Sequence, residues 1–256
     1  MANISWMYRN LAEDPLSITE TFGTSNTDYG TNRLADNNLQ SYFSFDRILM
    51  PTGTVANILF DFGSSVYVDS LIVVHNLDET GTMYFMIGDT NPPIGTYSLP
   101  ILGSTGTSVR FLDTPITNRY FKLFADGTKL SDVTKIREVF IGQRDVFPIN
   151  PEYPFRKEME SSTIVTESEK GQKKVYHKYT RNKWSFKYSA INDATYGTMS
   201  KIRKYCSGSY KPFFFCIDSD DAKFATYFVR FSKNGLKHTE IMVDCHDIEI
   251  NLEEEL

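Results

Sequence analysis

The chain has 256 residues, of which 41% are hydrophobic, 23% charged and 14% aromatic, and its 27 basic and 32 acidic side chains give a net charge of −5. That hydrophobic fraction excludes disorder as the main state, and no apolar run approaches the roughly 18 residues that a membrane-spanning helix needs. The net negative charge argues against a nucleic-acid-binding role, and the first residues lack the basic and apolar segments of a secretory signal.

The charge divides unevenly at the segment Phe147-Pro148-Ile149-Asn150-Pro151. Residues 1–150 carry 10 basic and 16 acidic side chains, a balance of −6, whereas residues 151–256 carry 17 and 16, a balance of +1. Because prolines around a short polar segment are typical of a connector, the sequence predicts two domains, residues 1–147 and residues 148–256. The alternative is a proline-rich loop inside one β-domain.

Apolar residues of the first part recur in short runs that are separated by turn-forming Gly, Pro, Asn and Asp. Ile58, Phe60 and Phe62, for example, fall on one face at the period of a strand. Strands are expected at residues 57–63, 69–75, 82–88, 108–112, 119–124 and 135–142. Many short strands at this spacing favour a mostly β fold, a sandwich or jelly roll.

Three segments of the first part, in the order found here, resemble the discoidin or galactose-binding-like domains. They are Arg33-Leu34-Ala35-Asp36-Asn37-Asn38, continuing to Phe43; Ile58-Leu59-Phe60-Asp61-Phe62-Gly63, continuing to Val73; and Asn118-Arg119-Tyr120-Phe121-Lys122-Leu123, followed by Ile136-Arg137-Glu138. The resemblance covers most of residues 3–145. Ser41 and Phe43 stand where the family has Thr and Trp, and the disulfide that is familiar in the family is missing.

The resemblance implies a jelly-roll binding or structural module whose loops at one end hold a glycan, often beside a structural calcium ion. Asp36 and Asn38 fall in the region of that calcium loop, and with Tyr42 and Phe43 they are the predicted ligand-binding residues. Turns in which the Asp36 and Asn38 side chains bond their own backbone are favoured, because a calcium site needs six to eight oxygens and only about two can be named. We therefore expect no metal and no other cofactor.

The second part begins with a predicted β-hairpin, in which residues 162–166 lead into a turn at Gly171 and residues 173–179 lead out. A strand follows at residues 183–190. Trp184, Phe186 and Tyr188 alternate there with polar residues, so the aromatic rings are expected on one face and the lysines on the other.

The period then changes to that of a helix. Asn192 or Asp193 is expected to cap a helix that continues to about Cys206, and Gly208 is expected to stop it. Strands are expected at residues 212–218, 224–231 and 239–252. The final Glu253-Glu254-Glu255 is interpreted as a solvated terminus.

This order of elements resembles the β-sandwich-like domains of bacteriophage distal-tail and minor tail proteins. The resemblance rests on residues 181–186, the helix, and residues 227–232. It implies a structural component of a tail tip or baseplate that is made in the host cytoplasm and located in the virion. Its partners would be other tail proteins, copies of itself in a homo-oligomeric ring built through exposed strand edges, and a host-surface glycan. The alternative is a soluble carbohydrate-binding module without a virion role.

Catalytic motifs are missing from the sequence: it has no P-loop, no GxSxG, no HExxH and no GxGxxG. We therefore predict that the chain is not an enzyme. Residues 218–221 contain three aspartates that a charged turn explains, and the lysines of residues 170–187 are interpreted as a solvated strand face rather than a nucleic-acid site.

The segment Asp244-Cys245-His246-Asp247 is the strongest candidate for a metal site. On a strand its alternate residues face opposite sides, so the four side chains cannot converge on one ion. Ordinary strand residues with a buried Cys245 are favoured over a site that joins part of this segment to His238 or His177.

Overall fold

The computed structural model describes residues 3–21, 30–44, 56–76, 83–99, 106–125, 135–152, 154–167 and 172–255. The chain divides into two compact units, one made of Met1–Val146 with Phe215–Thr226 and the other of Phe147–Phe214 with Tyr227–Leu256. The division into folding domains after residue 147 stays a prediction, and the turn expected at Gly171 lies outside the described residues.

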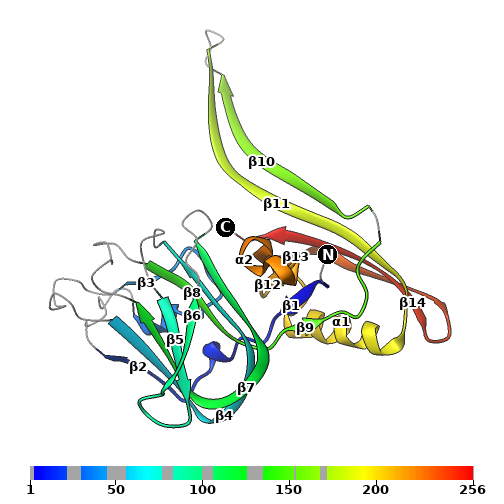
Figure 1. Cartoon of the computed structure of the whole chain (residues 1–256). Coiled ribbons are helices and arrows are strands. Elements are labelled where there is room, and N and C mark those ends of the chain that lie inside the picture. The colour runs from blue at the N-terminus through cyan, green and yellow to red at the C-terminus, as the bar shows by residue number, and fades with distance from the viewer. Residues whose placement is uncertain are drawn as a thin grey trace. The chain divides into compact units, whose positions relative to one another are not determined.

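The first unit is built from antiparallel strands (Figure 1). Its main sheet has the order β3-β8-β4-β7-β5-β6, and β2 pairs with β4. The strands are β2 Ser17–Thr21, β3 Phe43–Ser44, β4 Ala56–His75, β5 Met83–Gly88, β6 Gly95–Leu99, β7 Thr107–Ala125 and β8 Lys135–Gly142. Two short strands, β1 Ser5–Met7 and β9 Asp145–Val146, pair with each other. The 3-10 turns η1 Leu11–Glu13 and η2 Thr31–Arg33 complete this part.

The long strands β4 and β7 each run through two layers of the sandwich. Their pairing is interrupted by register shifts between Asp61 and Val66 and between Val68 and Ser70. Before this bend β4 pairs with β2, and after it β4 pairs with β8. Because bulges bend a strand without ending it, the sheet folds over into two layers. The result is the jelly-roll sandwich that the resemblance to galactose-binding-like domains implied.

The bend corrects one prediction from the sequence. Residues 57–63 and 69–75 were expected to be separate strands, as were residues 108–112 and 119–124, but each pair is one continuous strand. Polar residues between two apolar runs are typical of a turn, yet here they form the bulged part of a strand. Gly63, with a φ of 74°, supplies the backbone conformation that this irregularity requires.

Side chains from both layers fill a common core. Leu71, Val73, Val139 and Ile141 come from one layer, and Ile58, Phe60, Phe85, Phe121 and Leu123 come from the other. All of them are buried. The core therefore consists of the inward-facing alternate residues of the strands, as in other sandwiches.

The segment Phe215–Thr226 belongs to the first unit and contains the 3-10 turn η4 Ser219–Asp221 and the single helical turn α2 Ala222–Ala225. The Asp218 side chain accepts a hydrogen bond from the backbone N–H of Asp220 at 3.2 Å, which confirms the predicted charged turn. The strand expected at residues 224–231 begins only at Thr226, because α2 precedes it.

The second unit consists of an antiparallel sheet and the helix α1 Asp193–Tyr205 (Figure 1). The strands follow the order β10-β11-β14-β13-β12, with β10 at the edge, and the second half of β12 belongs to the segment Phe215–Thr226 of the first unit. Their bounds are β10 Arg156–Glu167, β11 Lys173–Ile191, β12 Phe213–Cys216, β13 Thr226–Met242 and β14 Cys245–Glu254. The strand expected at residues 239–252 is divided by a turn at Val243-Asp244, where Asp244 has a φ of 56°.

The aromatic residues of β11 lie in the core of the second unit, as predicted. Trp184, Phe186 and Tyr188 are buried, and the Trp184 ring lies 4.8 Å from that of Tyr227. The alternating Lys183 and Lys187 instead pair with the carboxylates of Glu160 and Asp247. This confirms a packed face opposite a solvated face and leaves the lysines already engaged.

Helix α1 has the caps that the sequence predicted. Asn192 Oδ1 accepts a hydrogen bond from the backbone N–H of Thr195 at 2.9 Å, and Gly208 follows the helix with a φ of 73°. Met199 and Ile202 are buried. Within the described part of the chain, no helix is long and apolar enough to cross a membrane.

The cap gives a prediction for stability. Replacing Asn192 with alanine is expected to lower the free energy of unfolding by about 1 kcal/mol, because the N–H of Thr195 loses its acceptor. Urea denaturation followed by circular dichroism measures this, with Lys201→Ala on the exposed side of α1 as the control. Equal stability of the two variants would contradict a capping role.

Candidate functional site

The loop that carries Asp36 and Asn38 is held by its own side chains. Asp36 Oδ1 accepts a hydrogen bond from the N–H of Asn38 at 3.0 Å, and Asn38 Oδ1 accepts one from the N–H of Gln40 at 3.0 Å. The hydroxyl of Ser41 donates to Asp36 Oδ2 at 2.5 Å. These bonds confirm the predicted Asx turns.

The turn rests on a buried carboxyl group. Glu138 on β8 is 1% exposed, and it accepts hydrogen bonds from Asn10 Nδ2 at 3.2 Å and from the N–H of Asn37 at 3.1 Å. Burial raises the pKa of Glu138 well above its usual value, and the negative charges of Asp36 and Glu13 raise it further. The predicted Asp36 loop is thus connected to β8 through a residue that the sequence identified only as part of a family motif.

The described residues contain no group of three or more His, Cys, Asp or Glu side chains that could hold a metal ion. Asp36 and Glu138 are close enough to interact electrostatically. Two carboxyl groups are far fewer than the six to eight oxygen ligands of a calcium ion, so these residues do not fit the ion that the family resemblance implied, and we assign no metal here.

The two aromatic candidates occupy different environments. Phe43 is fully buried in the sandwich core, and its backbone pairs with Ile136 on β8. Tyr42 is half-buried, and the Lys135 ammonium lies 4.1 Å from the centre of its ring. Of these two aromatic residues, Tyr42 is therefore the one whose ring is partly exposed to solvent. Ligand binding by Asp36, Asn38, Tyr42 and Phe43 stays a prediction.

The buried Glu138 gives a prediction for pH dependence. Its folded-state pKa is raised above the usual 4.5. At a pH between these two values, Glu138 is protonated in the folded protein and ionised in the unfolded chain. The free energy of unfolding therefore falls as the pH rises from about 4.5 toward the folded-state value. Glu138→Gln cannot ionise, so its stability is expected to fall less steeply over that window.

Thermal unfolding of both proteins from about pH 4 to 8 measures the difference in slope. The matched control is Glu158→Gln, which changes an exposed carboxylate of β10. Parallel curves for the wild type and Glu138→Gln would contradict the raised pKa.

The outer part of the hairpin β10–β11 presents apolar side chains on both faces. Val165 pairs with Val175, Ile164 pairs with Tyr176, and consecutive pairs face opposite sides. All four are exposed, with 56% for Val165 and 62% for Val175. β11 pairs with β14 only from Lys183 onward, so the outer part is a two-stranded ribbon (Figure 1). Such a ribbon is marginally stable in water by itself.

The sequence predicted this hairpin but not its exposed apolar surface. The adjacent apolar pair Ile164-Val165 was the available signal, because a strand with one buried face alternates apolar and polar residues.

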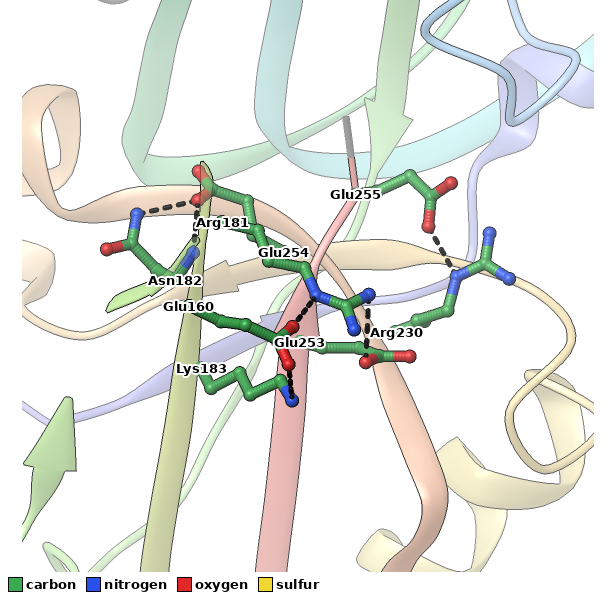
Figure 2. A network of polar contacts seen from close by, with 8 residues as sticks. All are labelled: Glu160, Arg181, Asn182, Lys183, Arg230, Glu253, Glu254 and Glu255. Atoms are coloured by element: carbon green, nitrogen blue, oxygen red, sulfur yellow. Dashed lines mark hydrogen bonds and ion pairs between the residues drawn. The ribbon is translucent and has the colours of Figure 1, made fainter. Parts of the chain in front are cut away.

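A network of ion pairs holds the base of the hairpin (Figure 2). The carboxylate of Glu160 on β10 forms ion pairs with Arg181 Nε at 2.6 Å and with Lys183 Nζ at 2.9 Å. Arg181 also contacts Glu253 of β14 at 3.1 Å. Lys183 and Arg181 hold the pKa of Glu160 below its usual value. The hairpin base is therefore fixed to the sheet, whereas the outer part has no further strand beside it among the described residues.

The acidic end of the chain belongs to this network, which corrects its interpretation as a solvated terminus. Glu253 and Glu254 lie within β14, and Glu254 accepts hydrogen bonds from both the backbone N–H and the amide of Asn182, at 2.9 and 2.6 Å. Glu255 pairs with Arg230 (Figure 2). The complementary cations come from strands distant in sequence, so the tail alone gave no indication of them.

A histidine pair lies where α1 begins. His238 Nε2 is 2.9 Å from His246 Nδ1, the opposite nitrogen of His246 contacts Asp193, and the Tyr196 ring stacks on both imidazoles. The structure thus brings His246 together with His238. These groups form a chain of contacts rather than surrounding a common point.

The three cysteines are free. Cys206 and Cys216 are buried, but Cys245 is only half-buried, so the prediction of a buried Cys245 is wrong. Cys245 is the first residue of β14 and directly follows the exposed turn at Val243-Asp244, which explains its partial exposure.

No protein-family model and no curated protein matches the chain. Among solved structures, CpGH89CBM32-6 produced by Clostridium perfringens is 15% identical, with 52% of this chain and 98% of that chain covered and a TM-score of 0.39. Chitosan-binding module 1 of a chitosanase/glucanase from Paenibacillus sp. IK-5 is 15% identical, with 53% and 99% covered and a TM-score of 0.41. The Streptococcus pneumoniae fucose binding module SpX-3 is 11% identical, with 53% and 98% covered and a TM-score of 0.40. At these identities and TM-scores the matches assign no function to the chain.

Proposed function

We propose that the chain is a non-enzymatic structural protein of a bacteriophage tail tip or baseplate, located in the virion. It assembles with copies of itself into a ring through the second unit and contacts other tail proteins. Its first unit, a jelly-roll sandwich, contacts a host-surface glycan. The tail role is supported by the sequence resemblance of residues 181–186, the helix and residues 227–232, and the ring is supported by the hairpin.

The observation that carries the ring is the outer part of the β10–β11 hairpin, defined as residues 159–167 and 173–182. Met159 is 74% exposed, and Val165 and Val175 are each more than half exposed. These apolar side chains are in contact with water, and burying them against another protein is favourable in free energy. β10 is also an edge strand, so its outward backbone groups are available to a further strand.

A second copy of the chain is the partner that these features favour. Strand β11 carries Lys173, Lys174 and Lys178 in the outer part of the hairpin, whereas residues 1–150 have a net charge of −6. A basic hairpin on one copy and an acidic first part on the next are complementary in charge. Contact between two different surfaces of identical chains is heterologous, and such contacts generate rings when the rotation closes.

Size-exclusion chromatography with light scattering tests the ring. Over a series of protein concentrations, we expect a species whose mass is a fixed multiple of the 29.3 kDa chain. A monomer at every concentration would overturn assembly through the hairpin.

A further inference from the structure

A second feature without an assigned role is a pocket in the first unit, lined by β7, the residues that follow β8, and η4. Its volume is about 510 Å³, and Arg110, Phe111, Asp113, Arg144 and Asp220 line it. Small-molecule sites in proteins usually have volumes of roughly 300–1,000 Å³ and combine an apolar wall with a few polar groups. This pocket has both properties.

The apolar wall of the pocket is held in place. The Arg144 guanidinium lies 4.6 Å from the centre of the Phe111 ring, at the distance of a cation–π contact. Asp69 accepts a hydrogen bond from the Arg144 backbone N–H at 2.9 Å, and its other oxygen lies 3.9 Å from Arg144 Nε. The ring and the guanidinium therefore form a fixed platform rather than two independent side chains.

The charged groups around the platform are not committed to protein partners. Arg110, Asp113 and Asp220 are exposed, and none of their side chains makes an ion pair with another described residue. The pocket thus offers a five-donor guanidinium and two carboxylate acceptors next to an aromatic ring.

A pocket in the second unit shows the contrast. Its volume is about 370 Å³ and its lining includes Lys183 and Trp184. However, Trp184 is only 1% exposed, and Lys183 is already paired with Glu160. Arg156 and Glu158 also line that pocket and make no ion pair with another described residue, but no ring face is available beside them, so the pocket of the first unit is the better candidate.

We propose that the pocket beside Phe111 and Arg110 binds a saccharide. Each sugar hydroxyl both donates and accepts hydrogen bonds, so a ligand with many hydroxyls satisfies Asp113, Asp220 and Arg110 together. The C–H groups of a pyranose ring pack against the platform that Phe111 and Arg144 form together. A purely anionic ligand is disfavoured by the two carboxylates, and a purely cationic one by the two guanidinium groups. This inference deepens the proposed glycan contact and rests on it, but it is independent of ring assembly.

Saturation-transfer-difference NMR with a panel of free sugars tests the site in the full chain. The probes are galactose, N-acetylgalactosamine, N-acetylglucosamine, glucose and rhamnose, each added alone. We expect at least one sugar to receive saturation from the wild type, and its affinity to fall about tenfold or more in Arg110→Ala and in Asp113→Asn. Arg137→Ala is the matched control, because Arg137 is an exposed arginine on β8 outside the pocket.

The sugar titrations distinguish the saccharide site in the pocket from the proposed glycan contact. If a sugar binds the wild type and all three variants equally, the pocket assignment is overturned while the proposed glycan contact stands. If no sugar of the panel binds the wild type, both the saccharide site and the glycan contact are overturned, and assembly is judged separately by light scattering. Phe111 is left unchanged because it is half-buried and its loss would also affect folding.

Discussion

Replacing Val165 and Val175 together with glutamate is expected to dissociate the assembled protein into monomers. The two residues are paired across the hairpin and lie on one face, so the double variant places two carboxylates next to each other in the proposed interface. Burying an unpaired carboxylate costs several kcal/mol, which corresponds to at least a hundredfold loss of affinity. Because both side chains are exposed in the single chain, the fold of each unit is expected to persist.

Light scattering at matched concentrations measures the mass, and circular dichroism verifies the fold. The control is the double variant Ile94→Glu with Tyr210→Glu, which makes the same charge change at two residues that are 81% and 82% exposed. Retention of the assembled mass by the Val165 and Val175 variant would show that the hairpin does not mediate assembly.

Replacing Trp184 with alanine is expected to lower the free energy of unfolding by roughly 3–5 kcal/mol, the usual range for a buried tryptophan. The indole is 1% exposed and packs against the Tyr227 ring at 4.8 Å. Its backbone joins β10 to β14 through pairs with Lys157 and Leu252. A cavity here therefore weakens both the core and the anchoring of the hairpin.

Chemical denaturation measures the loss, with Tyr210→Ala as the control because Tyr210 lies on the surface of the same unit. A change below about 1 kcal/mol for Trp184→Ala would mean that the second unit collapses around the missing ring. In that case Trp184 does not anchor the hairpin.

The elements predicted most accurately are those whose signals are local. Helix α1 begins and ends as expected because its cap at Asn192 and its stop at Gly208 lie within a few residues of the helix. The two long strands of the first unit were predicted as four because a bulge and a turn use the same polar residues. Only pairing with distant strands decides between the two.

The candidate sites also were predictable only where their signals are local in the sequence. The Asp36 and Asn38 turns were predictable because each side chain bonds a backbone N–H two residues on. The burial of Phe43 in the core was not predictable, since it depends on pairing with Ile136, 93 residues away by numbering. The Arg110 pocket was not predicted, because its lining comes from segments that only the fold brings together.

The most direct test of assembly through the hairpin is hydrogen–deuterium exchange of β10, residues 156–167, as a function of protein concentration. In the single chain the outward backbone N–H groups of this edge strand face solvent and exchange quickly. Slow exchange is expected at concentrations where the assembled mass is seen, and fast exchange on dilution or in the Val165 and Val175 variant. Fast exchange of β10 in a fully assembled sample would contradict assembly through the hairpin.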